Sequence, residues 1–136
     1  MAQHGHAARA GTTTPFATGA TISTTQANYD GTTAYGNGKT GLYRHRTVEV
    51  GVFAASPFLL NDMHGNVWEW VQECYGYSGP PTDGATVTFG DCTKRILRGG
   101  SWSNGPQDLR SANRDRVTPD TRNRYIGFRL ARTLSP

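Results

Sequence analysis

The stretch that decides the fold of this 136-residue chain is Asn61-Asp-Met-His-Gly-Asn-Val-Trp-Glu-Trp-Val71. Over 66–71 it alternates with the period of a β-strand, in which successive side chains point to opposite faces. One face carries two tryptophans and the other carries two valines and an acid: Trp68 and Trp70, against Val67, Glu69 and Val71. Because indole rings bury a large area, this pattern predicts a strand at the centre of the core.

Two further segments lie C-terminal to this stretch and are equally distinctive. The first is Arg95-Ile-Leu-Arg-Gly-Gly-Ser-Trp102. The second runs from Leu109-Arg-Ser-Ala-Asn-Arg114 through Thr118-Pro-Asp120 to Ile126-Gly-Phe-Arg-Leu-Ala-Arg132. Any one of these motifs alone would be a weak signal, so the specificity comes from their order and spacing.

Together with Ala7–Phe16 and Gln26–Gly31, these segments closely resemble the formylglycine-generating-enzyme (sulfatase-modifying factor) family. The resemblance implies an α+β, loop-rich fold of the C-type lectin-like class with short antiparallel strands. It covers almost the whole chain, which is therefore interpreted as a single domain over 1–136.

The region that matches is similar to the C-terminal half of that family's domain. The family's domain begins well before Ala7, with strands and a helix that have no counterpart in this sequence. Missing strands leave an open sheet edge and an uncovered core face. The N-terminal side is therefore expected to be a surface for association, for instance with a second copy of the chain.

Composition limits the size of the core. Apolar residues make up 35% of the chain, which is low for a compact globule, and 17 glycines are spread among the apolar stretches. The sequence therefore predicts a loop-rich fold whose core rests on a few large side chains. Those expected in the centre come from the motifs: Trp68, Trp70, Trp102, Ile126 and Phe128.

Outside the motifs the sequence predicts few regular elements. The alanine-rich stretch His6–Ala10 is typical of the last turn of a helix, which Gly11 would end. Short strands are expected over 48–53, 95–97 and 126–130. The rest of the chain, rich in Gly, Thr, Asn and Arg, is expected to be irregular.

The net charge of +4 raises nucleic acid as a partner. The arginines fall mainly between Arg95 and Arg132 and alternate with Asp and Asn, without a basic block or a nucleic-acid-binding motif, so no such partner is expected. No apolar run approaches membrane-spanning length and the first residues lack a signal-peptide core. The chain is expected to be soluble, without membrane contact, in a compartment that the sequence does not fix.

The resemblance also implies a structural calcium site. Asp62 and Glu69 would donate carboxylates, and Gly65 and Val67 would donate backbone carbonyls, which are the hard oxygen ligands that calcium prefers. Alternatively, Asp62 caps a turn and Glu69 pairs with an arginine. His64 lies beside this site but has no partner at ligand spacing, so it is interpreted as a surface residue.

Catalysis is not expected. Enzymes of the family use a cysteine pair, between the Gly-Gly-Ser-aromatic and Thr-Pro-Asp motifs, that binds copper through thiolates. Here 102–119 contains no cysteine, so copper is not expected either. The two cysteines, Cys74 and Cys92, flank a Gly/Pro-rich excursion and are compatible with one disulfide or two free thiols.

The segment 103–125 instead predicts a binding surface. Motif residues form an apparent frame, and the positions between them resemble the variable positions of diversity-generating-retroelement proteins with the same fold. These positions are Ser103, Asn104, Gly105, Gln107, Asp108, Asp115, Arg116, Val117, Thr121, Asn123, Arg124 and Tyr125. All except Gln107 are reachable from an asparagine codon by changes at adenine, and such residue types are common on adaptable recognition surfaces.

Two classes of function follow. The favoured one is a non-catalytic scaffold that binds a protein or small-molecule ligand and is diversified by a retroelement. The alternative is an oxidoreductase of the formylglycine-generating or a related type, divergent or incomplete. The ligand-binding class depends on the layout of 103–125, and the enzyme class depends on a thiolate pair that this region lacks.

Overall fold

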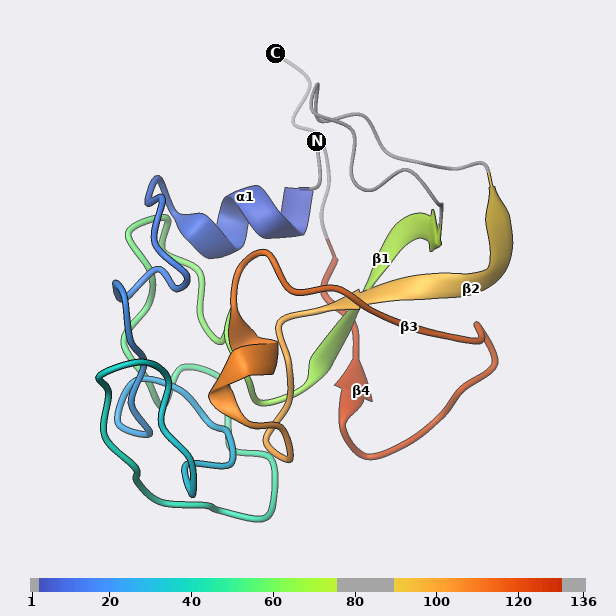
Figure 1. Cartoon of the computed structure of the whole chain (residues 1–136). Helices are drawn as coiled ribbons and strands as arrows, with labels where there is room; N and C mark the ends of the chain where they lie inside the picture. Colours follow the sequence, from blue (N-terminus) through green and yellow to red (C-terminus); the bar gives the residue numbers. More distant parts are fainter. Residues whose placement is uncertain (1–2, 76–89, 131–136) are drawn as a thin grey trace.

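The computed structural model describes residues 3–75 and 90–130. The elements, in chain order, are α1 (Gln3–Arg9), β1 (Trp68–Tyr75), β2 (Asp91–Arg98), the 3-10 helix η1 (Pro106–Leu109), β3 (Asp115–Val117) and β4 (Ile126–Gly127). Figure 1 shows the strands gathered on one side of the molecule and the long irregular part of the chain on the other. Within the described ranges, no helix has the length and apolar character needed to cross a membrane.

The four strands form one sheet in the order β3-β2-β1-β4. β1 and β2 are antiparallel, as are β2 and β3, but β4 runs parallel to β1 through Trp68 and Ile126. The prediction of antiparallel strands is therefore wrong for β4. The chain leaves β3 at one edge of the sheet and crosses to the other edge over 118–125, so it enters β4 in the direction of β1 (Figure 1).

A strand predicted over 48–53 is absent, because the backbone there is held by a side chain. The Asn66 amide oxygen accepts a hydrogen bond from the Val48 amide (3.0 Å), and the Asn66 amide nitrogen donates to the Val48 carbonyl (3.2 Å). Such side-chain bonds replace a strand ladder. The other predicted strands exist with changed bounds: β1 begins at Trp68, β2 is longer than 95–97, and β4 ends at Gly127.

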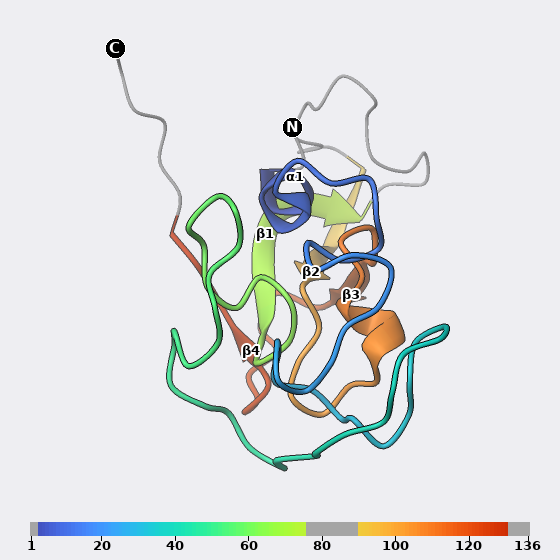
Figure 2. The ribbon, with the colours of Figure 1, turned by 90° about the vertical axis from the view of Figure 1, so that its left-hand side faces the viewer.

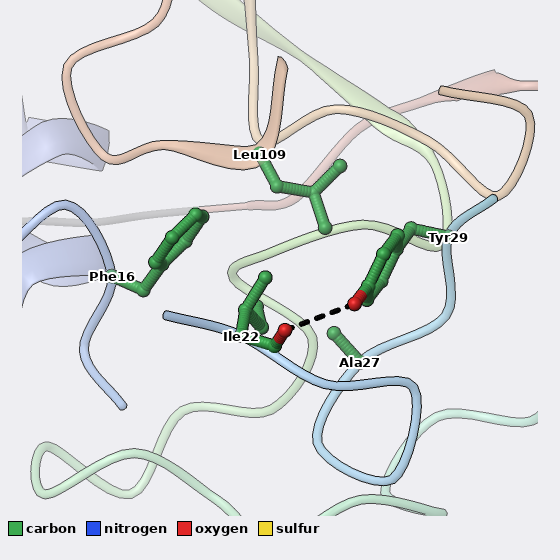
Figure 3. Packing of buried hydrophobic residues seen from close by; sticks show 5 residues of the cluster. All are labelled: Phe16, Ile22, Ala27, Tyr29 and Leu109. Carbon is green, nitrogen blue, oxygen red and sulfur yellow. Dashed lines mark hydrogen bonds between the residues drawn. The ribbon is translucent and has the colours of Figure 1, made fainter. Parts of the chain in front are cut away.

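The hydrophobic core is formed mainly by residues N-terminal to the 61–71 segment. Its fully buried cluster consists of Phe16, Ile22, Ala27, Tyr29 and Leu109, drawn in Figure 3. The Tyr29 hydroxyl donates to the Ile22 carbonyl (3.0 Å), so the one polar atom of this cluster is satisfied. Irregular segments thus contribute most of the packed apolar surface.

Part of the predicted aromatic core is confirmed. Trp68 and Trp102 are buried, at 4% and 5% exposure. Trp70 and Ile126 are only half-buried, and Phe128 is 74% exposed, so its assignment to the core is wrong. Phe128 directly follows β4, and the described residues leave most of its side chain uncovered.

Two histidines make contacts inside the fold that the sequence did not indicate. His64 is buried, and its Nε2 accepts from the Ala17 amide (3.1 Å) while its Nδ1 donates to the Leu109 carbonyl (2.7 Å), so it is not a surface residue. Burial lowers the pKa of His64, which keeps the ring neutral and able to accept at Nε2. His4, in α1, lies 3.1 Å from the Glu69 carboxylate, where Figure 2 shows α1 beside β1.

A disulfide joins Cys74, near the end of β1, to Cys92, near the start of β2. It closes the excursion between the two strands, of which residues 76–89 lie outside the described residues.

A cross-link over 18 residues restricts the unfolded chain. Replacing both cysteines by serine is expected to lower the free energy of unfolding by about 2–3 kcal/mol, measured by urea denaturation. An unchanged midpoint, with the disulfide verified in the wild type by mass spectrometry, would contradict this.

Candidate ligand-binding surface

The 103–125 segment is anchored at both ends by its backbone. At its start, the Trp102 amide donates to the Asn66 carbonyl (2.9 Å). At its end, the Trp68 amide donates to the Tyr125 carbonyl (2.8 Å). Both anchors lie in the 61–71 motif, which therefore fixes the two ends of the segment against the same part of the fold.

Arg98 anchors the middle of the segment. It is 4% exposed at the end of β2, and its Nη1 donates to the carbonyls of Ser111 (3.4 Å) and Asn113 (2.9 Å). Arg98 therefore holds two carbonyls of the segment from inside the fold. Residues 115–117 are held in turn by the ladder between β3 and β2. All these contacts use backbone atoms of the segment, so they do not depend on which side chains it carries.

Two of the twelve predicted surface residues face inward. The Asn104 amide oxygen accepts from the Trp68 indole (2.9 Å) and the Ser101 hydroxyl (2.6 Å). The Asn104 amide nitrogen donates to an Asp108 carboxylate oxygen (2.9 Å). This network links Asn104 and Asp108 to buried residues, so both side chains belong to the frame. The remaining ten positions divide between the turn and η1 over 103–107, the edge strand β3 and the 118–125 connection.

Around Trp102, an aromatic stack extends to the surface. The Arg124 guanidinium lies over the Trp102 ring, 5.3 Å from its centroid, and the ring of Tyr43 lies near-parallel to that of Trp102, with centroids 6.2 Å apart. His45 continues the stack, 3.8 Å from Tyr43. Tyr43 and His45 were missed by the sequence analysis. Their signal was weak, since both come from a stretch without a motif.

The other exposed positions lie on two further elements. On β3, Arg116 stacks over the Tyr75 ring at 4.1 Å and donates to the Tyr75 hydroxyl. In the 118–125 connection, Thr121 and Asn123 line a groove against the sheet. The predicted surface is therefore spread over several regions of the fold. Of its twelve positions, five are exposed and the others are half-buried: the exposed ones are Gln107, Asp115, Arg116, Arg124 and Tyr125.

Of the residues of the predicted calcium site, Glu69 is bonded to an arginine. Glu69 is 6% exposed, and both of its carboxylate oxygens accept hydrogen bonds from Arg129 (2.7–3.0 Å). Burial alone would raise the pKa of Glu69, but His4 and Arg129 outweigh it and hold this pKa below its ordinary value.

The carboxylate of Asp62 is better placed than that of Glu69 to bind a cation. One of its carboxylate oxygens accepts from the Gly51 amide (3.2 Å), while Oδ1 is buried without a hydrogen-bond partner. A buried carboxylate oxygen without a partner is costly, so it suits a cation ligand. Asp62 therefore has one carboxylate oxygen free to ligate a cation, whereas both carboxylate oxygens of Glu69 accept hydrogen bonds from Arg129.

The fold and its motifs match a known family. A family model described as the sulfatase-modifying factor enzyme 1-like domain matches residues 1–134. The chain belongs to this family. Among solved structures, the domain is similar to PvdO from Pseudomonas aeruginosa, with 33% identity and a TM-score of 0.75, over 93% of this chain and 48% of PvdO.

Two other solved structures share the fold of this domain. Treponema denticola variable protein 1 has 23% identity and a TM-score of 0.70, over 92% of this chain and 43% of that protein, which is a likeness of fold alone. CarF has 26% identity and a TM-score of 0.65, over 98% of this chain and 46% of CarF. The domain therefore spans about half the length of the solved proteins it resembles.

Curated relatives are longer still. The chain is 38% identical over 95 residues to the serine/threonine-protein kinase pkn1 of Chlamydia caviae, covering 63% of this domain and 15% of that protein. The pkn1 of Chlamydia pneumoniae is 37% identical over 98 residues, covering 65% of the domain and 15% of that protein. The match thus takes up a small part of each kinase.

Proposed function

We propose that this domain is a non-catalytic binding module that displays the side chains of 103–125 on a rigid frame. The observation that carries the proposal is the backbone anchoring of this segment by Asn66, Trp68 and Arg98. A segment held through its carbonyls and amides tolerates changes of its exposed side chains, which is the property that an adaptable recognition surface requires.

We further propose that a retroelement diversifies these positions in nature. The support is the layout of the segment and the fold shared with a protein named as variable, Treponema denticola variable protein 1. Sequencing the gene across a population of its source is expected to reveal substitutions at the exposed positions, with Asn104 and Asp108 retained for the network with Trp68. A uniform gene would remove diversification and leave a fixed binding module.

A pair of matched libraries tests the binding function. One randomises the exposed positions Gln107, Asp115, Arg116, Arg124 and Tyr125, and the control randomises the buried positions Arg98, Ser101, Trp102, Leu109 and Ser111. Most members of the first library are expected to fold with Tm within about 5 °C of the wild type, and display selection against arbitrary proteins is expected to yield binders. Few members of the control library are expected to fold. Equal fractions of unfolded members in the two libraries would contradict the proposal.

The alternative, an oxidoreductase of the formylglycine-generating type, would need a pair of thiolates to bind copper. The chain has two cysteines, and these form the disulfide between β1 and β2, which leaves no thiolate for copper. We expect no oxygen consumption above background when the purified domain is given copper and a cysteine-containing peptide. Oxygen consumption that depends on both copper and the peptide would overturn the non-catalytic proposal.

We also propose calcium as a structural ion at Asp62, with the partnerless carboxylate oxygen of Asp62 as support. At about ten times its Kd, calcium would stabilise the fold by about 1.4 kcal/mol, a Tm rise of about 3–8 °C over a sample in chelator. Asp62→Asn is expected to lose this rise, whereas the exposed control Asp120→Asn keeps it. An equal Tm in calcium and in chelator would exclude the site.

A further inference from the structure

The 118–125 connection crosses from β3 to β4 (Figure 1). A groove lies between this connection and the sheet. Its volume is about 660 Å³. β1 and β2 contribute Trp70 and Arg95, the connection contributes Arg122, and β4 and the residue after it contribute Ile126 and Phe128. Most of its lining residues belong to the motifs at 61–71, 95–102, 118–120 and 126–132.

The groove is cationic. Arg95 and Arg122 both line it, and among the described residues of its lining none is acidic. Each guanidinium is held in place by a carbonyl: Arg95 Nη1 donates to Gln72 (2.7 Å), and Arg122 Nη1 donates to Pro119 (3.3 Å). Their other nitrogens keep donors for a ligand. Asp120, whose charge interacts with that of Arg122, lies outside the lining, so the lining itself favours a carboxylate.

The groove is also apolar along one side. Trp70 and Ile126 are half-buried in its lining, and the Phe128 ring is 74% exposed. Leu130, two residues further on, is 88% exposed. Arg129, between these two, turns inward to Glu69, so Phe128 and Leu130 extend the apolar surface beyond the groove. Exposed apolar side chains next to fixed cations are typical of a binding site.

We propose that this groove binds an extended acidic peptide segment of another protein. A carboxylate of the segment pairs with Arg95 and Arg122, and a neighbouring aromatic or aliphatic side chain packs against Trp70 and Phe128. The inference rests on the proposed binding function and names the chemical class of the partner, since Thr121 and Asn123, two of the displayed positions, line the same groove.

The shape and surroundings of the groove favour a peptide over other ligands. A small molecule is held in a site that buries 70–90% of its surface, whereas the exposed Phe128 leaves this groove open along one side. A nucleic acid requires cations that follow its phosphates, whereas the surface beyond the groove continues with Leu130. An extended peptide satisfies both features, because its alternating side chains reach the arginines and the apolar surface in turn.

Calorimetric titration of the purified domain with three synthetic octapeptides tests the proposal. The first alternates glutamate with phenylalanine or leucine, the second replaces each glutamate by lysine, and the third replaces each apolar residue by serine. The acidic-apolar peptide is expected to bind with a Kd of roughly 10–100 μM, weakening as salt rises, and the other two at least about ten-fold more weakly. Equal binding of the acidic and basic peptides would overturn the proposal.

Point variants locate the binding. Arg95→Gln, Arg122→Gln and Phe128→Ala are each expected to weaken the first peptide about three- to ten-fold. Arg46→Gln removes the same charge from an exposed arginine outside the groove and is expected to bind as the wild type does. An unchanged Tm verifies that each variant is folded, and Arg122→Gln is the informative variant if Arg95→Gln unfolds. Groove variants that bind as Arg46→Gln does would overturn the site.

The failure of this inference is distinguishable from the failure of the binding function. If the acidic peptide does not bind but the exposed-position library yields binders, the display function stands and the groove proposal falls. If the acidic peptide does not bind and the exposed-position library yields no binders, both the display function and the groove proposal fall. Phenylpropionate that binds as tightly as the peptide would replace the peptide with a small carboxylic acid, and would overturn the proposal as stated.

Discussion

Replacing Gly65 by alanine is expected to lower the free energy of unfolding by at least about 4 kcal/mol. Gly65 has φ +82°, a conformation that costs an alanine about 1–2 kcal/mol. A Cβ at this position would also lie 2.4 Å from the backbone carbonyl oxygen of Asn28. That carbonyl accepts from the Asn66 amide (2.8 Å), so the backbone bridge that fixes the 61–71 motif would have to open.

Gly11→Ala separates strain from steric clash. Gly11 has a similar φ of +87°, but nothing lies within 4 Å of a Cβ at this position. Its loss should therefore be only the conformational cost, about 1–2 kcal/mol. Urea denaturation of both variants measures the difference. If Gly65→Ala loses no more than Gly11→Ala, the close approach of Asn28 does not constrain the fold.

Arg129→Ala is expected to cost about 3–4 kcal/mol. Its removal would strip the hydrogen bonds that Arg129 gives to the buried Glu69 carboxylate, and also its bond to the Asn61 carbonyl (2.8 Å). Removing one partner of a buried ion pair costs about 3–5 kcal/mol, because the other charge is left uncompensated. The Arg129 side chain retains 33% exposure, so solvent screening places the loss in the lower part of that range.

A double variant tests this mechanism. Glu69→Gln removes the buried charge, so Arg129→Ala combined with Glu69→Gln is expected to be at least about 1 kcal/mol more stable than Arg129→Ala alone. Arg46→Ala, at an exposed arginine, should change stability by less than about 0.5 kcal/mol. Thermal and urea unfolding of the wild type, Arg129→Ala, Glu69→Gln, the double variant and Arg46→Ala measure these differences. A double variant as unstable as the sum of the single variants would show that lost packing, not unpaired charge, explains the effect.

Local sequence was a good guide wherever the motif residues bond to one another. The 61–71, 95–102 and 109–132 segments are hydrogen-bonded together through Asn66, Trp68 and Arg98. Sequence was a poor guide to the core, since Phe16, Ile22 and Tyr29 belong to loops without periodicity. It also misplaced His64, whose two hydrogen bonds reach residues 47 and 45 positions away in the chain.

By itself, the sequence determined the family, the frame and the absence of a cysteine over 102–119, because these are properties of residue types in a fixed order. Only the tertiary structure decided which positions of 103–125 are displayed. Asn104 and Asp108 have the same polar character as their neighbours, but Asn104 accepts hydrogen bonds from Trp68 and Ser101 and donates one to Asp108. The groove was likewise invisible in sequence, because it exists only where the chain crosses the sheet to reach β4 and brings Arg122 over Trp70 and Arg95. Contacts between distant residues depend on the path of the chain, which local pattern does not encode.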